Sequence, residues 1–271
     1  MQKKLLVAAL GTLFAMPVLA ADAPAAAPAP AVTGNFTVTT NYIFRGLTQT
    51  NNKPALQGGF DYAHESGFYA GVWGSSISWI TDQGTANSSQ LELDTYFGLK
   101  NSFATDFSYD VGFLRYNYPA TYPATMAAVG NAKWVKADTN EVYGQIGYKF
   151  VTLKYSQSLG DTFALPNASG TSYVDLSASY PLADSGVTLG AHYGKQSYKG
   201  VTADALKAAG TDPSYSDYKL SVSKDFSGYA VALAYSATNT KDNQFYSTVG
   251  LPGNNVNTGK SAVVLSVTRT F

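Results

Sequence analysis

The side chains that most often carry catalysis or bind metals are scarce or isolated in this sequence. It contains two histidines and no cysteine, which excludes thiol nucleophiles, thiolate metal sites and disulfides. His64 lies beside Glu65 in a short polar segment, and His192 stands alone between Ala191 and Tyr193. The sequence has no glycine-rich phosphate loop, no histidine pair at metal-ligand spacing and no calcium-loop spacing. We therefore expect no cofactor, no metal and no enzyme activity.

Charged residues instead recur at alternating positions along apolar segments. In residues 89–100, Leu91, Leu93, Thr95, Phe97 and Leu99 share one face, and Glu92, Asp94 and Lys100 lie on the other. Successive side chains of a β-strand point to opposite faces, so one face requires an apolar medium and the other water. The same assignment places a mixed set of charges on the polar faces of the whole series: Arg45, Asp61, Glu92, Asp94, Lys100, Asp110, Glu141, Lys149, Lys154, Asp175, His192, Asp217 and Lys219.

The elements that position these residues are predicted to be β-strands. Period-two alternation bounded by turn residues predicts about twelve strands after residue 33. The pattern does not decide which face of residues 68–80 meets lipid, because apolar side chains occupy both faces of that segment. The expected strands cover residues 35–45, 55–63, 68–80, 89–100, 107–118, 141–150, 151–159, 172–182, 187–198, 215–226, 229–238 and 260–271.

Short and long connections alternate along the chain. Outer-membrane barrels have short periplasmic turns and long extracellular loops, whereas a soluble sandwich with Greek-key crossovers has no reason to alternate. We therefore predict an all-β fold, a single antiparallel transmembrane β-barrel of about 12 strands with both termini at the periplasmic rim. The short connections are residues 64–67, 101–106, 150–151, 183–186 and 227–228, and the long ones are 46–54, 81–88, 119–140, 160–171, 199–214 and 239–259.

Local structure is also predicted for two of the long loops. Residues 202–209 are predicted to form a short helix that Thr202 caps and Gly210 ends, with an irregular loop as the alternative. The loop 119–140 contains Trp134 and either stands in solvent or folds inward and narrows a pore.

The N-terminal segment is predicted to be a targeting signal. Lys3 and Lys4 precede the apolar residues 5–19, and a small-residue site predicts cleavage after Ala20. Residues 1–20 are thus expected to be a signal peptide, residues 21–33 a flexible Ala/Pro-rich leader and residues 34–271 the barrel. No later stretch approaches the roughly 20 apolar residues that a spanning helix needs.

Composition agrees with a membrane barrel. Lys plus Arg and Asp plus Glu both number 18. The chain therefore lacks the excess of basic residues that would indicate a nucleic-acid partner. Charged residues make up only 13% of the chain and aromatic residues 14%, including 20 tyrosines, which suits strand ends at a lipid–water boundary. On the apolar faces, basic residues occur only near strand ends, where they reach water: Arg115, Lys195, Lys224 and Arg269.

Two stretches near the start of the barrel carry a family resemblance. Residues 42–54 (YIFRGLTQTNNKP) and 55–76 (ALQGGFDYAHESGFYAGVWGSS), with the signal and the closing strand, resemble the TorF-type porins of Gram-negative bacteria. The resemblance implies an outer-membrane barrel that passes small solutes, and it supplies no functional residues. The last strand also resembles a barrel-assembly signal, with Phe271 preceded by Val267, Leu265 and Val263, although Arg269 occupies a position that is usually apolar.

These observations predict a porin-like channel for passive diffusion of small hydrophilic solutes or ions. Outer-membrane lipids and the barrel assembly machinery are the other expected partners. Rings of acidic side chains around a pore favour the passage of cations, so a slight acidic surplus on the polar faces predicts a weak cation preference. One alternative is a barrel hydrolase, but a lipid-cleaving enzyme needs its histidine on the outer surface, and His192 lies on the face opposite Ala191 and Tyr193. The other is a non-conducting barrel whose charges pair across the lumen, because twelve strands are intermediate between filled and open barrels.

Overall fold

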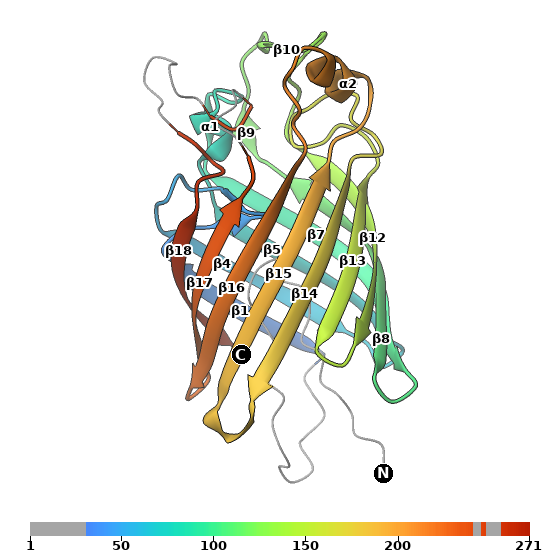
Figure 1. Cartoon of the computed structure of the whole chain (residues 1–271), viewed down its shortest axis with the longest axis vertical. Coiled ribbons are helices and arrows are strands. Elements are labelled where there is room, and N and C mark those ends of the chain that lie inside the picture. Colours follow the sequence, from blue (N-terminus) through green and yellow to red (C-terminus); the bar gives the residue numbers. More distant parts are fainter. Residues whose placement is uncertain (1–30, 241–244, 248–255) are drawn as a thin grey trace.

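The computed structural model describes residues 31–240, 245–247 and 256–271. Within these residues, 12 strands form one closed antiparallel barrel, which confirms the predicted fold class (Figure 1). The described helices are short, and none is long and apolar enough to cross a membrane. The predicted signal peptide and most of the predicted leader lie outside the described residues. The first strand begins at Val32, inside the range that we expected to be leader.

Each barrel strand pairs with its neighbours in sequence, and the first strand closes the ring on the last. β1 and β18 pair from Asn35↔Thr270 to Thr39↔Ser266. Beyond that register, the backbone N–H of Gly34 donates to the carbonyl of Phe271 at 2.7 Å and the N–H of Phe271 donates back at 2.9 Å. The barrel strands are β1 (Val32–Thr39), β4 (Ala55–Ala63), β5 (Phe68–Ser76), β7 (Leu91–Phe103), β8 (Phe107–Asn117), β12 (Thr139–Tyr148), β13 (Val151–Ser158), β14 (Ser172–Leu182), β15 (Val187–Ser197), β16 (Tyr215–Phe226), β17 (Tyr229–Thr238) and β18 (Ala262–Thr270).

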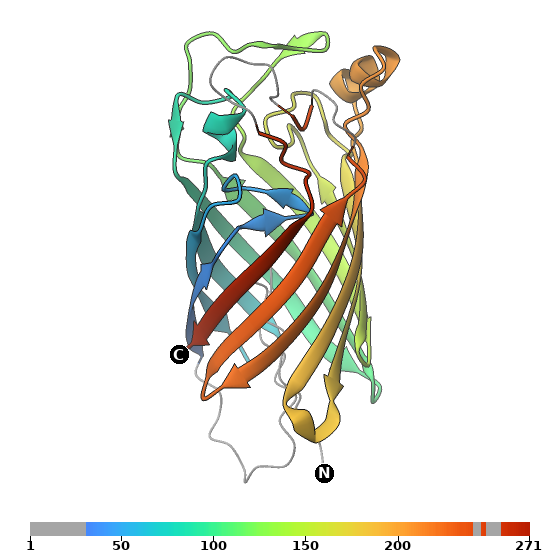
Figure 2. The same cartoon turned by 60° about the vertical axis from the view of Figure 1, so that its left-hand side comes forward.

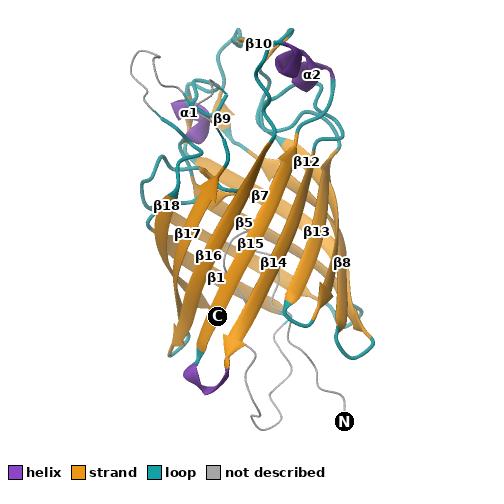
Figure 3. Cartoon of the chain, in the orientation of Figure 1, coloured by secondary structure: helices purple, strands orange, loops and turns teal. Residues whose placement is uncertain are grey.

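The two ends of the barrel differ as the spacing predicts. The tight turns, the start of β1 and the end of β18 lie at one rim, here called the short-turn rim. Six long connections lie at the other rim, here called the long-loop rim (Figures 1 and 2). Figure 3 shows that the short elements sit mainly in the connections at the long-loop rim. These elements are β2 (Ile43–Phe44), β3 (Leu47–Thr48), α1 (Trp79–Asp82), β6 (Ser88–Ser89), β9 (Ala120–Thr121), β10 (Ala128–Val129), β11 (Ala132–Lys133) and α2 (Val201–Ala208), while the turn η1 (Ala183–Ser185) lies at the short-turn rim.

Two predicted strands end four or more residues earlier than expected. The prediction for residues 35–45 is wrong after Thr39, because the chain leaves the wall there and the later aromatic residues Tyr42 and Phe44 are buried inside the barrel. The strand predicted for 68–80 stops at Ser76, and helix α1 follows. The structure also shows which face of this strand points outward. Phe68 and Val72 are exposed on the outside, whereas Tyr69 and Trp73 are buried inside.

The helix predicted for 202–209 is present as α2, but its start differs. Gly200 occupies the N-cap position, and Thr202 lies within the first turn, so the prediction that Thr202 caps the helix is wrong. Gly210 follows the last turn with φ of +85°, the left-handed conformation that glycine adopts readily at a helix end.

The exterior of the barrel carries a band of apolar side chains between two rings of aromatic residues. On β16, Tyr218, Leu220, Val222 and Phe226 are exposed, while Asp217, next to Tyr218, is buried. Phe103, Phe107, Tyr148, Phe150 and Tyr180 lie near the short-turn rim, and Tyr155, Tyr193, Tyr218 and Tyr235 lie nearer the long-loop rim. The rise and tilt of barrel strands place Tyr218 and Phe226 roughly 20 Å apart along the barrel axis. This exterior is the surface that a lipid bilayer requires.

The buried core lies inside the barrel, toward the long-loop rim. It is built from aromatic side chains of the wall and of the loops, including Tyr42, Trp73, Trp79, Tyr116 and Tyr118. Tyr42 contacts Trp73 edge-on with ring centroids 5.6 Å apart, and Trp79 contacts Tyr118 at 5.4 Å. A barrel of twelve strands therefore uses its interior for packing as well as for polar residues.

Candidate functional site

The candidate site is the lumen, which is lined by the inward side chains of the wall. Alternation along each strand puts the predicted acidic residues Asp61, Glu92, Asp94, Asp110 and Glu141 inside, each with less than a tenth of its surface exposed. Burying carboxylates is costly unless they are paired or hydrogen-bonded, so the partners of these groups show how the lumen is organised.

One segment enters the lumen from the long-loop rim. Residues 40–54, here called the first loop, join β1 to β4 and contain the short hairpin of β2 and β3. Figure 2 shows this hairpin inside the outline of the barrel. Asn41 ties the loop together, since its amide carbonyl accepts from the hydroxyls of Thr48 at 2.6 Å and Thr50 at 3.2 Å.

Arg45 fastens the first loop to a distant part of the wall. Its guanidinium nitrogens donate to both carboxylate oxygens of Glu141 on β12, at 3.0 and 2.7 Å. β12 is five strands from β1 in one direction around the barrel and seven in the other, so this ion pair spans the lumen. The exposed fractions of the two side chains are only 8% and 2%. A bidentate pair in such a buried position is strong and geometrically specific.

Further contacts enclose the Arg45 guanidinium. It donates to the side-chain carbonyl of Gln196 on β15 at 3.0 Å and lies 4.3 Å from the ring centroid of Tyr173 on β14. Phe44 of the same loop and Phe163 cover it at 4.9 and 5.7 Å. We predicted Arg45 as a pore-lining residue on a strand; the structure places it in the lumen, but on the first loop.

A second contact fixes the first loop to the same side of the wall, two strands from β12. The hydroxyl of Tyr42 donates to Glu92 on β7 at 2.8 Å. Beside Glu92, Asp94 points into the same buried region, and its Oδ1 atom has no hydrogen-bond partner among the described residues. The first loop is thus held against β7 and β12, which are separated in the wall by β8.

Nearer the short-turn rim, tyrosine hydroxyls pair with lumen carboxylates. Tyr69 donates to Asp110 at 2.6 Å and also contacts the hydroxyl of Tyr143, while Tyr96 donates to Asp61 at 2.5 Å. The predicted lysines lie against these rings, with Lys100 Nζ 4.9 Å from the Tyr69 centroid and Lys154 Nζ 3.9 Å from that of Tyr143. Carboxylates, phenols and ammonium groups therefore alternate around this part of the lumen.

His192 belongs to a network across β14, β15 and β16. Its Nε2 atom lies 2.9 Å from Asp217, and its Nδ1 atom lies 3.2 Å from Asp175 and 3.0 Å from Ser177. Lys219 pairs in register with His192 on the neighbouring strand. Both imidazole nitrogens face carboxylates, and the Ser177 hydroxyl donates to Asp175 at 2.5 Å. The arrangement therefore ties three strands together on the lumen side.

Lys149 is the predicted pore-lining residue that the structure does not place in the lumen. It occupies the turn between β12 and β13 with φ of +52°, and its side chain is half exposed. Its nearest acidic partner is Asp106 in the neighbouring turn, 3.9 Å away. The prediction is wrong because the strand ends at Tyr148, so the turn interrupts the alternation that assigned Lys149 to the inner face.

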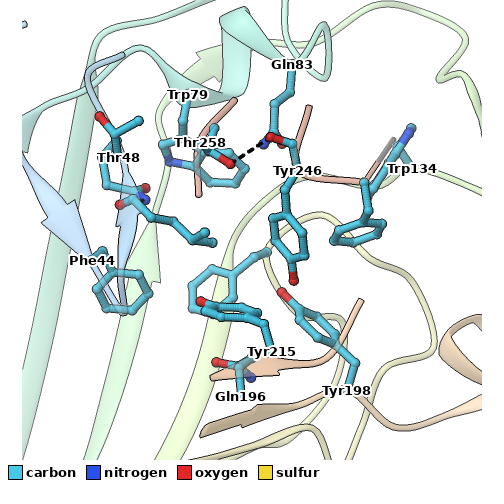
Figure 4. Close-up of a pocket in the computed structure, with 14 residues that line it drawn as sticks. Phe44, Thr48, Trp79, Gln83, Trp134, Gln196, Tyr198, Tyr215, Tyr246 and Thr258 are labelled. Carbon is cyan, nitrogen blue, oxygen red and sulfur yellow. Dashed lines mark hydrogen bonds between the residues drawn. The ribbon is translucent and has the colours of Figure 1, made fainter. Parts of the chain in front are cut away.

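Above the first loop lies a pocket to which all six long loops or their strand ends contribute (Figure 4). Its aromatic lining includes Trp79 from α1, Trp134 from residues 118–138, Phe163 from residues 159–171, and Tyr246 from residues 239–261. The loop 119–140, for which an inward fold was the alternative, reaches the lumen mouth through Trp134, whereas the first loop is the segment that enters the barrel. Sequence reasoning missed this pocket, because its residues are scattered over all the loops.

Among the residues that the structure describes, the lining of the pocket carries no charged side chain. Gln49, Gln83 and Gln196 supply carboxamides, and Thr48 and Thr258 supply hydroxyls. Burial raises the pKa of the Tyr198 and Tyr246 hydroxyls well above the ordinary value for tyrosine, so both stay neutral. Figure 4 shows these rings facing the space below Gln83, with Thr258 bonded to the backbone carbonyl of Tyr246.

A closed antiparallel barrel with an apolar exterior, a polar lumen and an inward first loop has the architecture of a porin-like protein. The chain belongs to the Gcw_chp family, described as "Bacterial protein of unknown function", whose model matches residues 22–271. No curated protein matches the chain significantly.

Solved structures similar to the chain include KdgM, OprD and OccAB3. The KdgM porin aligns with a TM-score of 0.49 and 8% identity over 88% of this chain and 99% of that one. OprD from Pseudomonas aeruginosa aligns with a TM-score of 0.38 and 13% identity over 89% of this chain and 66% of that one. OccAB3 from Acinetobacter baumannii has a TM-score of 0.41 and 13% identity over 90% and 65%.

Proposed function

We propose that the protein is an outer-membrane channel that passes small hydrophilic solutes by passive diffusion, with the first loop as its constriction. The observation that carries this proposal is the opposite polarity of the two barrel surfaces. Leu220 is 64% exposed on the outside, whereas Asp217, three residues earlier on the inner face of the same strand, is 2% exposed. A barrel in lipid needs such an exterior, and a polar interior suits an aqueous path.

The first loop sets the width of this path. Arg45 and Tyr42 hold it against Glu141 on β12 and Glu92 on β7, and Gly46 lies against Asp217 on β16, so the loop crosses the upper lumen. General porins with 16 to 18 strands have a much wider interior than a barrel of this size. The channel is therefore narrow, and its solutes are small.

The lumen charges favour cations weakly. Seven carboxylates of the wall face the lumen, and five basic groups lie there once Lys149 is removed from the predicted set, with His192 counted as basic because carboxylates face both of its ring nitrogens. Acidic residues along a pore attract cations, but most of these carboxylates already bond to tyrosine, arginine or histidine, which weakens the effect.

The residues that resemble TorF-type porins coincide with this constriction. Residues 42–54 make up most of the first loop, and residues 55–76 form β4, β5 and the turn between them. We propose on this basis that the chain is a TorF-type porin. Export through cleavage after Ala20, and recognition of β18 and Phe271 by the barrel assembly machinery, are part of the same proposal. N-terminal sequencing of protein from isolated outer membranes should begin at Ala21, and a Phe271 deletion should lower the folded fraction there.

Single-channel recording tests the channel directly. Residues 21–271 are refolded, a heat-modifiable band on gel electrophoresis confirms the folded barrel, and currents are recorded in planar bilayers. We expect small, uniform conductance steps and a reversal potential that indicates modest cation preference in a salt gradient. A folded barrel that gives no conductance steps would contradict the channel proposal and favour a non-conducting barrel closed by the first loop.

A further inference from the structure

We infer that the aromatic pocket at the long-loop rim binds a neutral sugar. This inference deepens the proposed function by naming the solute class, and it rests on that function for the statement that the bound sugar is a transported solute. The pocket itself is defined by side chains of the described residues and not by the conductance of the barrel.

The first argument is the chemistry of the lining. Eight of its 14 residues are aromatic, and most of the others are glutamine or threonine. A sugar ring presents an apolar face of C–H groups and an edge of hydroxyls. Aromatic faces can cover the first, and carboxamides and hydroxyls can bond to the second, which is the usual division of labour in ligand pockets.

The second argument is the absence of charge. No described residue in the lining is acidic or basic, and Arg45 in the lumen is already paired with Glu141 at 2.7 Å. A charged solute would lose hydration on entering and would meet no compensating group. The site therefore discriminates against uronates and phosphorylated sugars of the same size.

The third argument is an unpaired donor in the lining. Trp79 is 8% exposed, and its indole Nε1–H has no hydrogen-bond partner among the described residues. A buried donor without a partner costs free energy. Because the Nε1 atom itself is almost completely buried, a bound hydroxyl oxygen removes that cost when the neighbouring side chains of the pocket move aside. Trp79 belongs to the pocket lining, together with Trp134 on the loop at residues 118–138 (Figure 4).

Isothermal titration calorimetry on the full mature chain, folded in detergent, tests this inference. The probes are the neutral trisaccharide maltotriose, a uronate trisaccharide, and indole as an uncharged aromatic without hydroxyls. We expect saturable binding of maltotriose, and no binding or at least tenfold weaker binding of the uronate. Binding of indole without maltotriose, or equal affinity for the neutral and charged sugars, overturns the inference.

Matched tryptophan variants locate the site. Trp79→Phe removes the indole donor but keeps an aromatic ring, so maltotriose affinity should fall about 3- to 10-fold, as for loss of one hydrogen bond. Trp73→Phe is the control, because Trp73 is equally buried in the same aromatic cluster and lies outside the pocket lining. Each variant must show the heat-modifiable folded band. Equal losses in the two variants overturn the assignment of the site.

The two proposals fail separately. Conductance steps without maltotriose binding overturn the sugar site and leave the channel intact. Maltotriose binding that depends on Trp79, in a barrel that gives no steps, supports the site and refutes the channel.

Discussion

Arg45 and Glu141 are 96 residues apart in the sequence, and they form a bidentate ion pair at 3.0 and 2.7 Å inside the barrel. Arg45 is on the first loop and Glu141 lies on the inward face of β12, so the pair joins a connection to the wall on the far side of the lumen. Because both side chains are almost completely buried, the pair holds the loop in one position.

Arg45→Ala is expected to widen the channel. The substitution leaves Glu141 buried without its partner, an arrangement that typically costs about 3–5 kcal/mol, so the first loop should leave its docked position. Single-channel conductance should rise and the open level should become noisier. Lys149→Ala is the control, since it removes a basic residue from an exposed turn outside the lumen. Unchanged conductance in Arg45→Ala would show that the loop does not limit the current.

Asp175→Asn is expected to reduce the cation preference. Asp175 is the lumen carboxylate with a substantially exposed side chain, at 30%, so its charge acts on ions in the path. Removing one negative charge should shift the reversal potential in a salt gradient toward that of an unselective pore. The control is Asp225→Asn, which removes the same charge from an exposed residue at the short-turn end of β16. A shift of equal size in both variants would contradict the role of the lumen.

Leu220→Arg is expected to destabilise the barrel in lipid. Leu220 lies at the middle of β16 on its outer face, where a positive charge costs about 2–4 kcal/mol at the bilayer centre. Phe226→Arg lies on the same strand and face at the short-turn rim, where the cost falls to about 0–1 kcal/mol. Urea unfolding in lipid vesicles should separate the two variants. If both lose the same stability, the exterior band is misplaced.

The wall of the barrel could be predicted from sequence because strand alternation is a local signal. Residues 172–182, 215–226 and 229–238 match β14, β16 and β17 at both ends, since one face meets apolar surroundings along their whole length. The basic residues predicted near strand ends also lie there: Arg269 is exposed beside the turn at Ser227, whose carbonyl accepts from it at 3.1 Å.

The first loop could not be predicted in this way. Residues 35–45 keep an alternating pattern of aromatic residues past the end of β1, so the pattern alone extends the strand. What turns the chain inward is contact with residues far away in sequence: Glu92 for Tyr42 and Glu141 for Arg45. The pocket has the same origin, because only the closed barrel brings Trp79, Trp134 and Tyr246 together.

Gly46→Ala provides a test of the docked first loop that changes no charge. Gly46 has φ of +80°, and a Cβ atom there would lie 2.5 Å from Asp217 Cβ and 2.6 Å from Thr238 Cγ2 on the wall of β16 and β17. The loop can accept the methyl group only by moving away from the wall. Conductance should therefore rise as in Arg45→Ala, while the heat-modifiable band of the barrel stays in place.

Gly84→Ala separates this clash from the cost of backbone conformation. Gly84 has φ of +72° in a long loop, and a Cβ atom there would meet nothing within 4 Å. Both substitutions force alanine into the left-handed region at a cost of about 1–2 kcal/mol, so only the contact with the wall differs. We expect native conductance for Gly84→Ala. If the two variants raise conductance equally, strain in the loops and not contact between Gly46 and the wall would explain the change, and the first loop would not be the constriction.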